Sequence, residues 1–553
     1  MRGSVNINAS LNPKVSIVGY LGVSLLLLSL FTFFFASLTW WLALPFFLSF
    51  PLALVASQGG LIWESGFSRA AVWRLLCLLA VILLSVVLSG LIQDFSFDGN
   101  TYHQNAIYAL AHGWNPISGR NQGALLGSLW SQYYTLGMET LAASVYSITG
   151  LIQTGKAANL WLVLAMVFMT AEALSFTPLS RWRWYVAVAL LCNPVVITQM
   201  FSFYVDFVQY VLLVLAICCF HVWAASSRRI WLAYLAAILA FSFAVKINVA
   251  FWVFLYSFIY YLLFQKHRVS AGLVVAVFVG AALAGFFMLG YFPYITNFIS
   301  RGNPFFPLIG QGSVDIITGN TPPEVQDMSR FLAPFYSIAY PFTEQCQFSQ
   351  YFLASKLDAR LGGFGPIFLP VLLLSFAVLC VRSNLLLRSL QYRCVAFAVS
   401  LLVGTLLLPA GWWARYVPFV YLMAVVAVIY GFFNWRTRVL PKILTALLIL
   451  NAAFFIPQMA MKYVQYGAFL SRFMALPEPV RIDGYNVGMV VRLIDADKPF
   501  QIVPEENCNY EIAVGPPVKL LSDAPPAIPQ SVSVLGLDVA MPKVTELKME
   551  SQQ

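Results

Sequence analysis

The sequence is poor in charge: only 10% of its 553 residues are Asp, Glu, Lys or Arg, whereas about a quarter of the residues of a soluble domain are charged. It has only four histidines, and the two in its first long polar segment are too far apart for a metal motif. It lacks a Walker phosphate loop, a dinucleotide-binding glycine pattern, cysteine pairs with zinc spacing and a G-x-S-x-G elbow. The net charge of +10 forms no basic patch on a soluble domain, so nucleic-acid binding is not indicated.

Apolar residues are abundant instead. They make up 60% of the chain and recur in runs of about 18 or more, each long enough to cross a hydrocarbon core of roughly 30 Å. The first such run follows a polar N-terminus, is too long for a cleavable signal and lacks a small-residue cleavage site. The sequence therefore predicts an all-α polytopic membrane protein with about thirteen spans. The spans are expected near residues 16–36, 39–56, 75–92, 157–177, 185–201, 206–224, 230–246, 249–264, 271–291, 366–381, 395–409, 416–434 and 439–457.

The basic residues support this topology. If the N-terminus is cytoplasmic, the even-numbered turns between spans should carry Lys and Arg, and they do. Three long segments, 93–156, 292–365 and 458–553, then lie on the opposite side. We expect residues 1–457 to form the transmembrane module and the tail to form a small periplasmic β or α/β domain, disordered after Met541. Since no organelle-targeting signal is visible, the expected location is a bacterial inner membrane, with the long segments in the periplasm.

Most cysteines lie in or beside the spans, where a thiol is usually a small core residue. Cys346 and Cys508 are the two that fall in the outer soluble segments. In an oxidising compartment, a disulfide between the long loop and the tail is expected from this pair. The alternative is two unpaired thiols.

Ionisable residues from distant segments fall at the outer ends of the spans. Asp98 follows the third span and Asp206 precedes the sixth. Lys246 and Asn248 end the seventh span, and Arg415 precedes the twelfth. The cations could instead extend to the lipid headgroups, and the acids could cap helices or form turns. Because ionisable groups at membrane depth usually face a cavity or pathway, the whole set favours a shared polar cavity at the outer face.

The first outer segment reads "SFDGNTYHQNAIYALAHGWNP" (96–116). From Asn100 onward its pattern predicts a short helix along the membrane surface, with Trp114 as an interfacial anchor. Asp98 would then stand at the start of this helix, which both holds and aims its carboxylate. His103 is interpreted as a hydrogen-bonding partner in the cavity rather than a metal ligand.

A carboxylate flanked by cations at the outer face suggests chemistry on a phosphate-bearing lipid. Arg pairs bidentately with phosphate and Lys supplies a point charge. Glycosyl transfer from a polyprenyl-phosphate sugar needs a base for the acceptor hydroxyl and cations for the departing phosphate. An inverting displacement needs only one such carboxylate, since the phosphate leaves without an acid.

At this point the sequence resembles the C-type (GT-C) membrane glycosyltransferases, which include the aminoarabinose transferases of lipid A and the protein O-mannosyltransferases. Their first outer loop carries an acid followed by a Tyr, in patterns such as "DE-x-x-Y", and here Asp98 and Tyr102 match those positions. The segments "FISRGNPFFPL", "LDARLGGFGP" and "WWARYVP" also resemble bacterial surface-polysaccharide glycosyltransferases. Two features depart from the family: its loop lysine is missing from "WSQYYTLGMETLAASVY", and the first outer loop follows the third span rather than the first.

The resemblance implies an inverting transferase that moves a sugar to a lipid-linked glycan such as O-antigen or lipopolysaccharide. Asp98 would be the general base, and Arg415 and Lys246 would bind the donor phosphate in place of the missing loop lysine. The residues expected to bind sugar or acceptor are Asp206, His103, Tyr102, Glu139 and Asn248. No cofactor is required, although a divalent cation would be compatible with the phosphate chemistry.

Two other functions remain open. One is an O-antigen polymerase or ligase that uses prenyl-diphosphate glycans and relies on arginines in its outer loops. The other is a transporter or flippase for a lipid-linked sugar, which would need a polar path across the membrane. The mid-span positions are almost wholly apolar, and no long internal repeat of the kind found in many transporters is evident.

Overall fold

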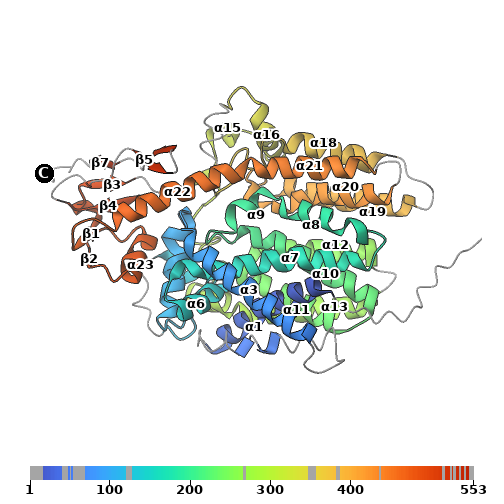
Figure 1. Ribbon diagram of the computed structural model, residues 1–553, viewed down its shortest axis with the longest axis horizontal. Helices are drawn as coiled ribbons and strands as arrows, with labels where there is room; N and C mark the ends of the chain where they lie inside the picture. Colours follow the sequence, from blue (N-terminus) through green and yellow to red (C-terminus); the bar gives the residue numbers. More distant parts are fainter. Residues whose placement is uncertain are drawn as a thin grey trace, which may run out of the picture.

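The structure is a computed structural model that describes residues 16–39, 48–49, 51–53, 69–119, 128–265, 269–346, 357–381, 387–434, 438–512, 517–522, 526, 531–534, 537–540 and 544–546. These residues are mostly helical. A bundle of long helices makes up most of the molecule, and a small sheet domain lies at one end of its long axis (Figure 1).

Eight helices in the described part of the chain are long and apolar enough to cross a membrane. They comprise α1 (Ile17–Thr39), α3 (Arg69–Leu91), α7 (Ala157–Ser175) with the turn η3 (Ile152–Lys156), α10 (Asp206–Ser226), α12 (Ile247–Tyr260) with η5 (Tyr261–Gln265), α13 (Ala271–Leu283) with η6 (Ala284–Leu289), α19 (Arg388–Leu407), and α21 (Leu440–Ala453) with α22 (Phe455–Phe473). Shorter apolar helices are α11 (Ile230–Val245), α18 (Phe368–Cys380), and α20 (Leu422–Phe433) with η12 (Pro418–Tyr421). The prediction of a helical membrane protein is confirmed at this level.

Two of the predicted spans differ from the helices observed. The span expected at 185–201 is broken into α8 (Arg183–Leu191) and α9 (Pro194–Gln199). Pro194 has no N–H to continue α8, and the side chain of Asn193 caps α9 by accepting from the Val195 N–H at 3.0 Å. The last span was expected to end at 457, but α22 runs through that point to Phe473. Most of the span expected at 39–56 lies outside the described residues.

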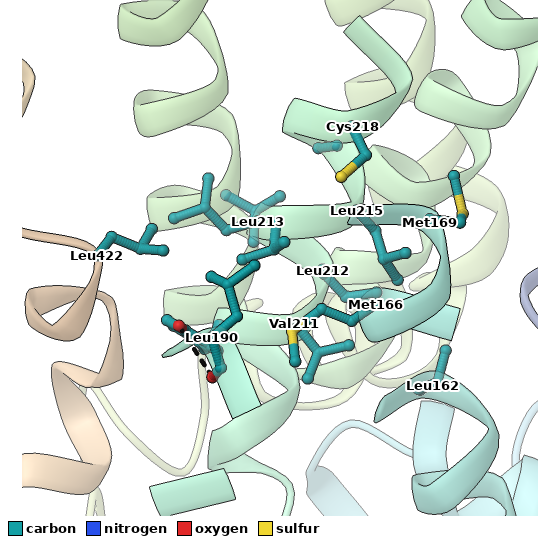
Figure 2. Packing of buried hydrophobic residues seen from close by; sticks show 14 of the residues in the cluster. Leu162, Met166, Met169, Leu190, Val211, Leu212, Leu213, Leu215, Cys218 and Leu422 are labelled. Carbon is teal, nitrogen blue, oxygen red and sulfur yellow. Dashed lines mark hydrogen bonds between the residues drawn. The ribbon is translucent and has the colours of Figure 1, made fainter. Parts of the chain in front are cut away.

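The centre of the bundle is apolar. Figure 2 shows side chains of α7 and α10 packed together, with Leu190 of α8 and Leu422 of α20 among the residues drawn. All residues of α10 from Asp206 to Ala216 are buried, as expected for a helix that is apolar on every side. Asp206 is the first residue of α10, and the buried residues that follow it, 207–216, carry no charge. The middle of the bundle is therefore uncharged along this helix.

The outer segments fold into short helices. The first contains η1 (Gly99–His103), α4 (Gln104–Ala111), α5 (Leu129–Tyr133) and α6 (Gly137–Thr149). The second contains η7 (Tyr291–Ile295), α14 (Thr296–Arg301), η8 (Thr318–Asn320), α15 (Pro323–Gln326), α16 (Ala333–Ala339) and η9 (Tyr340–Phe342). A helix follows Asp98 as predicted, but protein and not lipid covers its apolar residues. Ile107, Leu110 and Trp114 are buried in protein, and Trp114 packs edge-on against Phe292.

The tail contains a small α/β sheet domain. Its five-stranded sheet has the order β2-β1-β4-β3-β7, in which only β1 and β2 are parallel. The elements are β1 (Val480–Ile482), α23 (Val487–Asp495), β2 (Phe500–Ile502), β3 (Tyr510–Ile512), β4 (Val518–Leu520) and β7 (Val544–Glu546), with a separate hairpin of β5 (Ser531–Val534) and β6 (Leu537–Ala540).

Two details of the predicted tail are wrong. The domain does not begin at 458, because α22 occupies residues up to Phe473 and packs Phe469 and Phe473 into the core beneath the sheet. The stretch after Met541 is not disordered throughout, because β7 pairs with β3 in antiparallel register. A strand of three residues is too short to show an alternation of apolar and polar residues, so the sequence alone did not predict β7.

Candidate functional site

Arg415 lies at the centre of an ion-pair network formed by residues from five segments of the chain. Its Nη1 atom is 3.1 Å from Asp98 Oδ2 and 2.8 Å from Asp358 Oδ1. Its Nε atom is 3.7 Å from Asp206 Oδ2. Asp206 also accepts a hydrogen bond of 2.9 Å from Lys246 Nζ. The two predicted acids and both predicted cations thus meet at one place.

Each of these side chains stands at the end of a helix or in a turn. Asp98 immediately precedes η1, and Asp206 is the first residue of α10. Lys246 adopts an extended backbone (φ −174°) between α11 and α12, so its side chain leaves the helical stack. Arg415 lies in the short turn η11 (Ala414–Tyr416), between α19 and η12. Apolar helices thus bring the ends of distant segments together while keeping charge out of their interiors.

A further ion pair extends the network outward. Arg360 donates from Nε to Asp358, and its Nη2 atom donates to Asn320 Oδ1 at 2.7 Å. The outer charge network therefore consists of three carboxylates (Asp98, Asp206, Asp358) balanced by three cations (Lys246, Arg360, Arg415). This balance makes the burial of so many charges tolerable.

Exposure varies across the outer charge network. The side chains of Asp206 and Arg415 are only 4% and 6% exposed, whereas Asp98 is 19% and Arg360 37% exposed. Burial by itself would lower the pKa of Arg415, but the carboxylates of Asp358, Asp98 and Asp206 hold it well above its usual value. Arg415 is therefore a permanent cation, and Asp98 is the most exposed of the three network acids.

Aromatic rings enclose the two buried cations. The guanidinium of Arg415 lies 4.5 Å from the ring centroid of Trp413 and 5.0 Å from that of Tyr204. The ammonium of Lys246 lies 4.9 Å from the ring centroid of Tyr416. Ring faces attract cations, and these contacts are strongest where water is excluded. The rings thus help to keep both cations in place.

Two tyrosines, the half-buried Tyr102 and the buried Tyr204, border the acids. Burial, followed by the carboxylate of Asp98, holds the pKa of Tyr102 and of Tyr204 well above its usual range. Both phenols therefore keep their protons and can donate hydrogen bonds to an anionic or hydroxyl-bearing ligand.

His103 and Glu139 form a buried pair beside the network. His103 Nδ1 is hydrogen bonded to Glu139 Oε1, and the His103 ring lies 4.2 Å from that of Tyr102. Asn248, at the start of α12, has a buried Oδ1 atom without a hydrogen-bond partner among the described residues. The structure thus brings His103 and Tyr102 to the edge of the network and places Glu139 one contact further away.

Sequence reasoning missed Asp358 and Arg360. They are two residues apart in "LDARLGG", a pair of opposite charges in a loop that is otherwise apolar and glycine-rich. Two opposite charges in an otherwise uncharged loop were the sequence feature that could have identified these residues. The loop is fixed by Trp413, whose Nε1 donates to the Asp358 carbonyl at 2.7 Å. Trp413, two residues before Arg415, therefore also positions the acid that Arg415 binds.

The expected disulfide is not formed. Cys346 and Cys508 are both free thiols, and burial raises the pKa of each. Cys346 follows η9 in the second outer segment, whereas Cys508 precedes β3 inside the tail domain. Figure 1 shows α16 and β3 in separate parts of the molecule. Cysteine counting predicted the wrong bond because it carries no information on distance.

An apolar groove of about 690 Å³ lies between α12 and α19. Its lining includes Phe251 and Trp252 on α12 and Val403 and Leu407 on α19. Phe251 follows Lys246 by five positions, roughly 7.5 Å along a helix axis. In the chain, five positions thus separate the first lining residue on α12 from Lys246. No group of three or more His, Cys, Asp or Glu side chains suited to a metal ion occurs in the described part of the chain.

Neither a protein-family model, nor a curated protein, nor a solved structure matches this chain.

Proposed function

We propose that this protein is a GT-C membrane glycosyltransferase that moves a sugar from a polyprenyl-phosphate donor to a lipid-linked glycan, such as O-antigen or lipopolysaccharide, at the periplasmic face of a bacterial inner membrane. The shorter apolar helices would supply spans beyond the eight long ones. The observation that supports this function is the direct contact of Arg415 with Asp98 within a balanced, partly exposed set of charges.

The contacts of Arg415 suggest how the site would respond to a donor. The phosphate of the donor is a diester, joined to both the prenyl chain and the sugar, and its two free oxygens share one negative charge that suits the fork of an arginine. On binding between Arg415 and Lys246, it would displace the carboxylate of Asp98 from Nη1. The donor would thereby release the base that the reaction needs.

The proposed reaction is a single inverting displacement. The acceptor hydroxyl oxygen forms a bond to the anomeric carbon while the bond from that carbon to the phosphate oxygen breaks. Asp98 takes the hydroxyl proton, and the prenyl phosphate leaves with its electron pair, stabilised by Arg415 and Lys246. Asp206 would hold the two cations apart at their working separation. Tyr102, His103, Glu139 and Asn248 would orient the sugar or acceptor hydroxyls.

The apolar groove between α12 and α19 supports a lipid donor in particular. A prenyl chain held there would gain about 25 cal/mol for each Å² of apolar surface removed from water, and its phosphate would reach the outer charge network. A transporter is less well supported, because the described middle of the bundle is packed with apolar side chains (Figure 2).

The test is a transfer assay with purified protein in liposomes that contain a lipid-linked glycan acceptor. Radiolabelled prenyl-monophosphate and prenyl-diphosphate sugars are supplied in separate reactions. Label is expected on the acceptor from the monophosphate alone. Transfer from the diphosphate alone would instead identify a polymerase or ligase, and passage of the labelled lipid across the bilayer without transfer would identify a flippase.

A further inference from the structure

The tail domain contacts the acid-bearing loop through one helix. Val487 and Val491 of α23 belong to the same apolar cluster as Ile107 and Leu110 of α4. α23 also packs on η1, the turn that Asp98 precedes. In Figure 1, α23 lies on the side of the sheet domain that faces the bundle. The domain is therefore docked against the loop that carries the proposed base.

Arg492 of α23 makes the polar contacts with the turn 94–100. Its Nη1 atom donates to Asn100 Oδ1 at 2.9 Å and to the Gly488 carbonyl at 2.7 Å. Its Nη2 atom donates to the Asp94 carbonyl at 2.8 Å. The residue is only 5% exposed, so a buried cation binds neutral oxygens on both sides of Asp98 in the sequence.

Asn100 passes this constraint on to the chain. Its Nδ2 atom donates to the carbonyls of Asp94 and Ser96, at 3.2 and 2.7 Å. The approach is close: a Cβ atom on Gly488 would lie 2.1 Å from Asn100 Oδ1. Arg492 and Asn100 thus tie together the carbonyls that fix the turn 94–100, and Asp98 lies within that turn.

The chemistry of this contact suits positioning better than stability. A buried cation bound to neutral groups costs desolvation energy, and replacing buried ionic groups with packed apolar ones is often neutral or stabilising. A guanidinium, however, offers several donors in a rigid plane and can hold several oxygens in fixed relative positions. That is the property a reactive carboxylate needs from its support, since a displacement of about 1 Å can lower a rate about a hundredfold.

We propose that Arg492 is a positioning residue, which fixes the turn 94–100 through Asn100 and the Asp94 carbonyl and so aims the carboxylate of Asp98. The inference rests on the proposed function, because it gives the tail domain a part in the same transfer reaction. The tail domain is then a component of the site and not only a brace for the outer loops.

The test compares Arg492→Met and Arg492→Lys with two controls in the full chain. Arg472→Met removes an exposed arginine from α22. Asp495→Asn weakens the other end of α23, where Asp495 accepts from Tyr146 Oη at 2.6 Å and the Ile152 N–H at 3.0 Å. We expect Arg492→Met to lower kcat for transfer about a hundredfold while the donor KM changes less than about twofold. Arg492→Lys should fall between it and wild type, and both controls should stay within about threefold of wild type.

Hydrogen exchange of the peptide 94–103 provides a second readout that does not depend on activity. The Asn100 N–H is bonded to the Ser96 carbonyl at 3.1 Å, so its exchange should become faster in both Arg492 variants and remain unchanged in Arg472→Met. Unchanged exchange, an unchanged kcat in folded Arg492→Met, or an equal loss of kcat in Asp495→Asn would each overturn the positioning role. A wild-type protein that transfers no sugar would instead overturn the proposed function, and the exchange result would still decide whether Arg492 fixes this turn.

Discussion

Asp94 and Asp98 lie four positions apart in "DFSFD" and have opposite surroundings. Asp94 is fully buried, and its carboxylate accepts from the Ser96 N–H at 2.9 Å and the Ser96 hydroxyl at 2.8 Å. Asp98 is partly exposed, and its carboxylate pairs with Arg415, which comes from a distant segment. The first acid is held by its own turn, whereas the second is held by a cation that has other carboxylates to bind.

The difference extends to the two clusters around these acids. The docking cluster, made of Asp94, Asn100, Gln153, Lys156 and Arg492, is closed: Lys156 is 0% exposed and donates to Gln153 Oε1 at 2.7 Å and to the Ile92 carbonyl. Burial raises the pKa of Asp94, and Lys156 opposes that rise. The outer charge network is open at Asp98 and Arg360, so its partners can exchange. A closed cluster fixes structure, whereas an open one can accept a ligand.

The largest effect should come from Asp98→Asn. Asparagine keeps the size of the side chain but cannot take a proton from the acceptor. Transfer should fall by about 10³-fold, roughly 4 kcal/mol in the barrier, while the protein stays folded. Initial rates of label transfer measure this, with the exposed Asp327→Asn in the second outer segment as the matched control. Full activity in Asp98→Asn would remove the proposed mechanism.

Lys156→Met should act on folding instead of chemistry. The change leaves the fully buried carboxylate of Asp94 without the cation that most favours its charged form, which is expected to cost about 3 kcal/mol of stability. Thermal unfolding in detergent should show a lower midpoint than in wild type. The same midpoint in both proteins would mean that the docking cluster does not hold the loop, and the contrast between the two acids would disappear.

Arg415→Lys should weaken the donor site without emptying it. A lysine keeps the charge but cannot bind a phosphate through two parallel hydrogen bonds, and it loses the flat contact with Trp413. We expect kcat/KM for the donor to fall about thirtyfold, roughly 2 kcal/mol. Saturation of the rate should also require a higher donor concentration than in wild type. A variant with wild-type kcat/KM would show that the phosphate binds elsewhere.

The smallest effect should come from reductant. Since Cys346 and Cys508 are free thiols, dithiothreitol should leave the unfolding midpoint unchanged, whereas loss of a native disulfide typically costs about 2–5 kcal/mol. Thermal unfolding with and without reductant decides the matter. A clear drop in midpoint would restore the disulfide that the sequence suggested.

The sequence located the long apolar helices and the charged residues at their ends, because both depend on composition and local order. It missed the break between α8 and α9, where Asn193 and Pro194 outweigh an otherwise apolar run. It also misplaced the first outer helix. Ile107 and Trp114 have the pattern of a membrane-surface helix, but α6 and α23 cover that face with protein. A pattern shows that a face is apolar and not what covers it.

For the site, the sequence could name four charges on one side but not their pairing. That Arg415 binds Asp98, Asp206 and Asp358 depends on how α10, α19 and α20 pack, over separations of up to 317 residues. Asp358 and Arg492 were not singled out, because one lies in a loop and the other in a tail domain with no catalytic pattern. The local sequence around a residue carries no information about its distance from a segment far away in the chain.

The sequence by itself determined that the protein is helical and apolar enough to span a membrane, and that many of its charges fall at the ends of its apolar segments. These follow from the cost of placing polar groups in hydrocarbon, which acts on each segment separately. Only the tertiary structure decided that Asp94 is fully buried and that Asp98 is partly exposed. It also decided that the tail domain packs against the turn containing Asp98. Those outcomes depend on contacts between distant segments, where burial and pairing are set by packing.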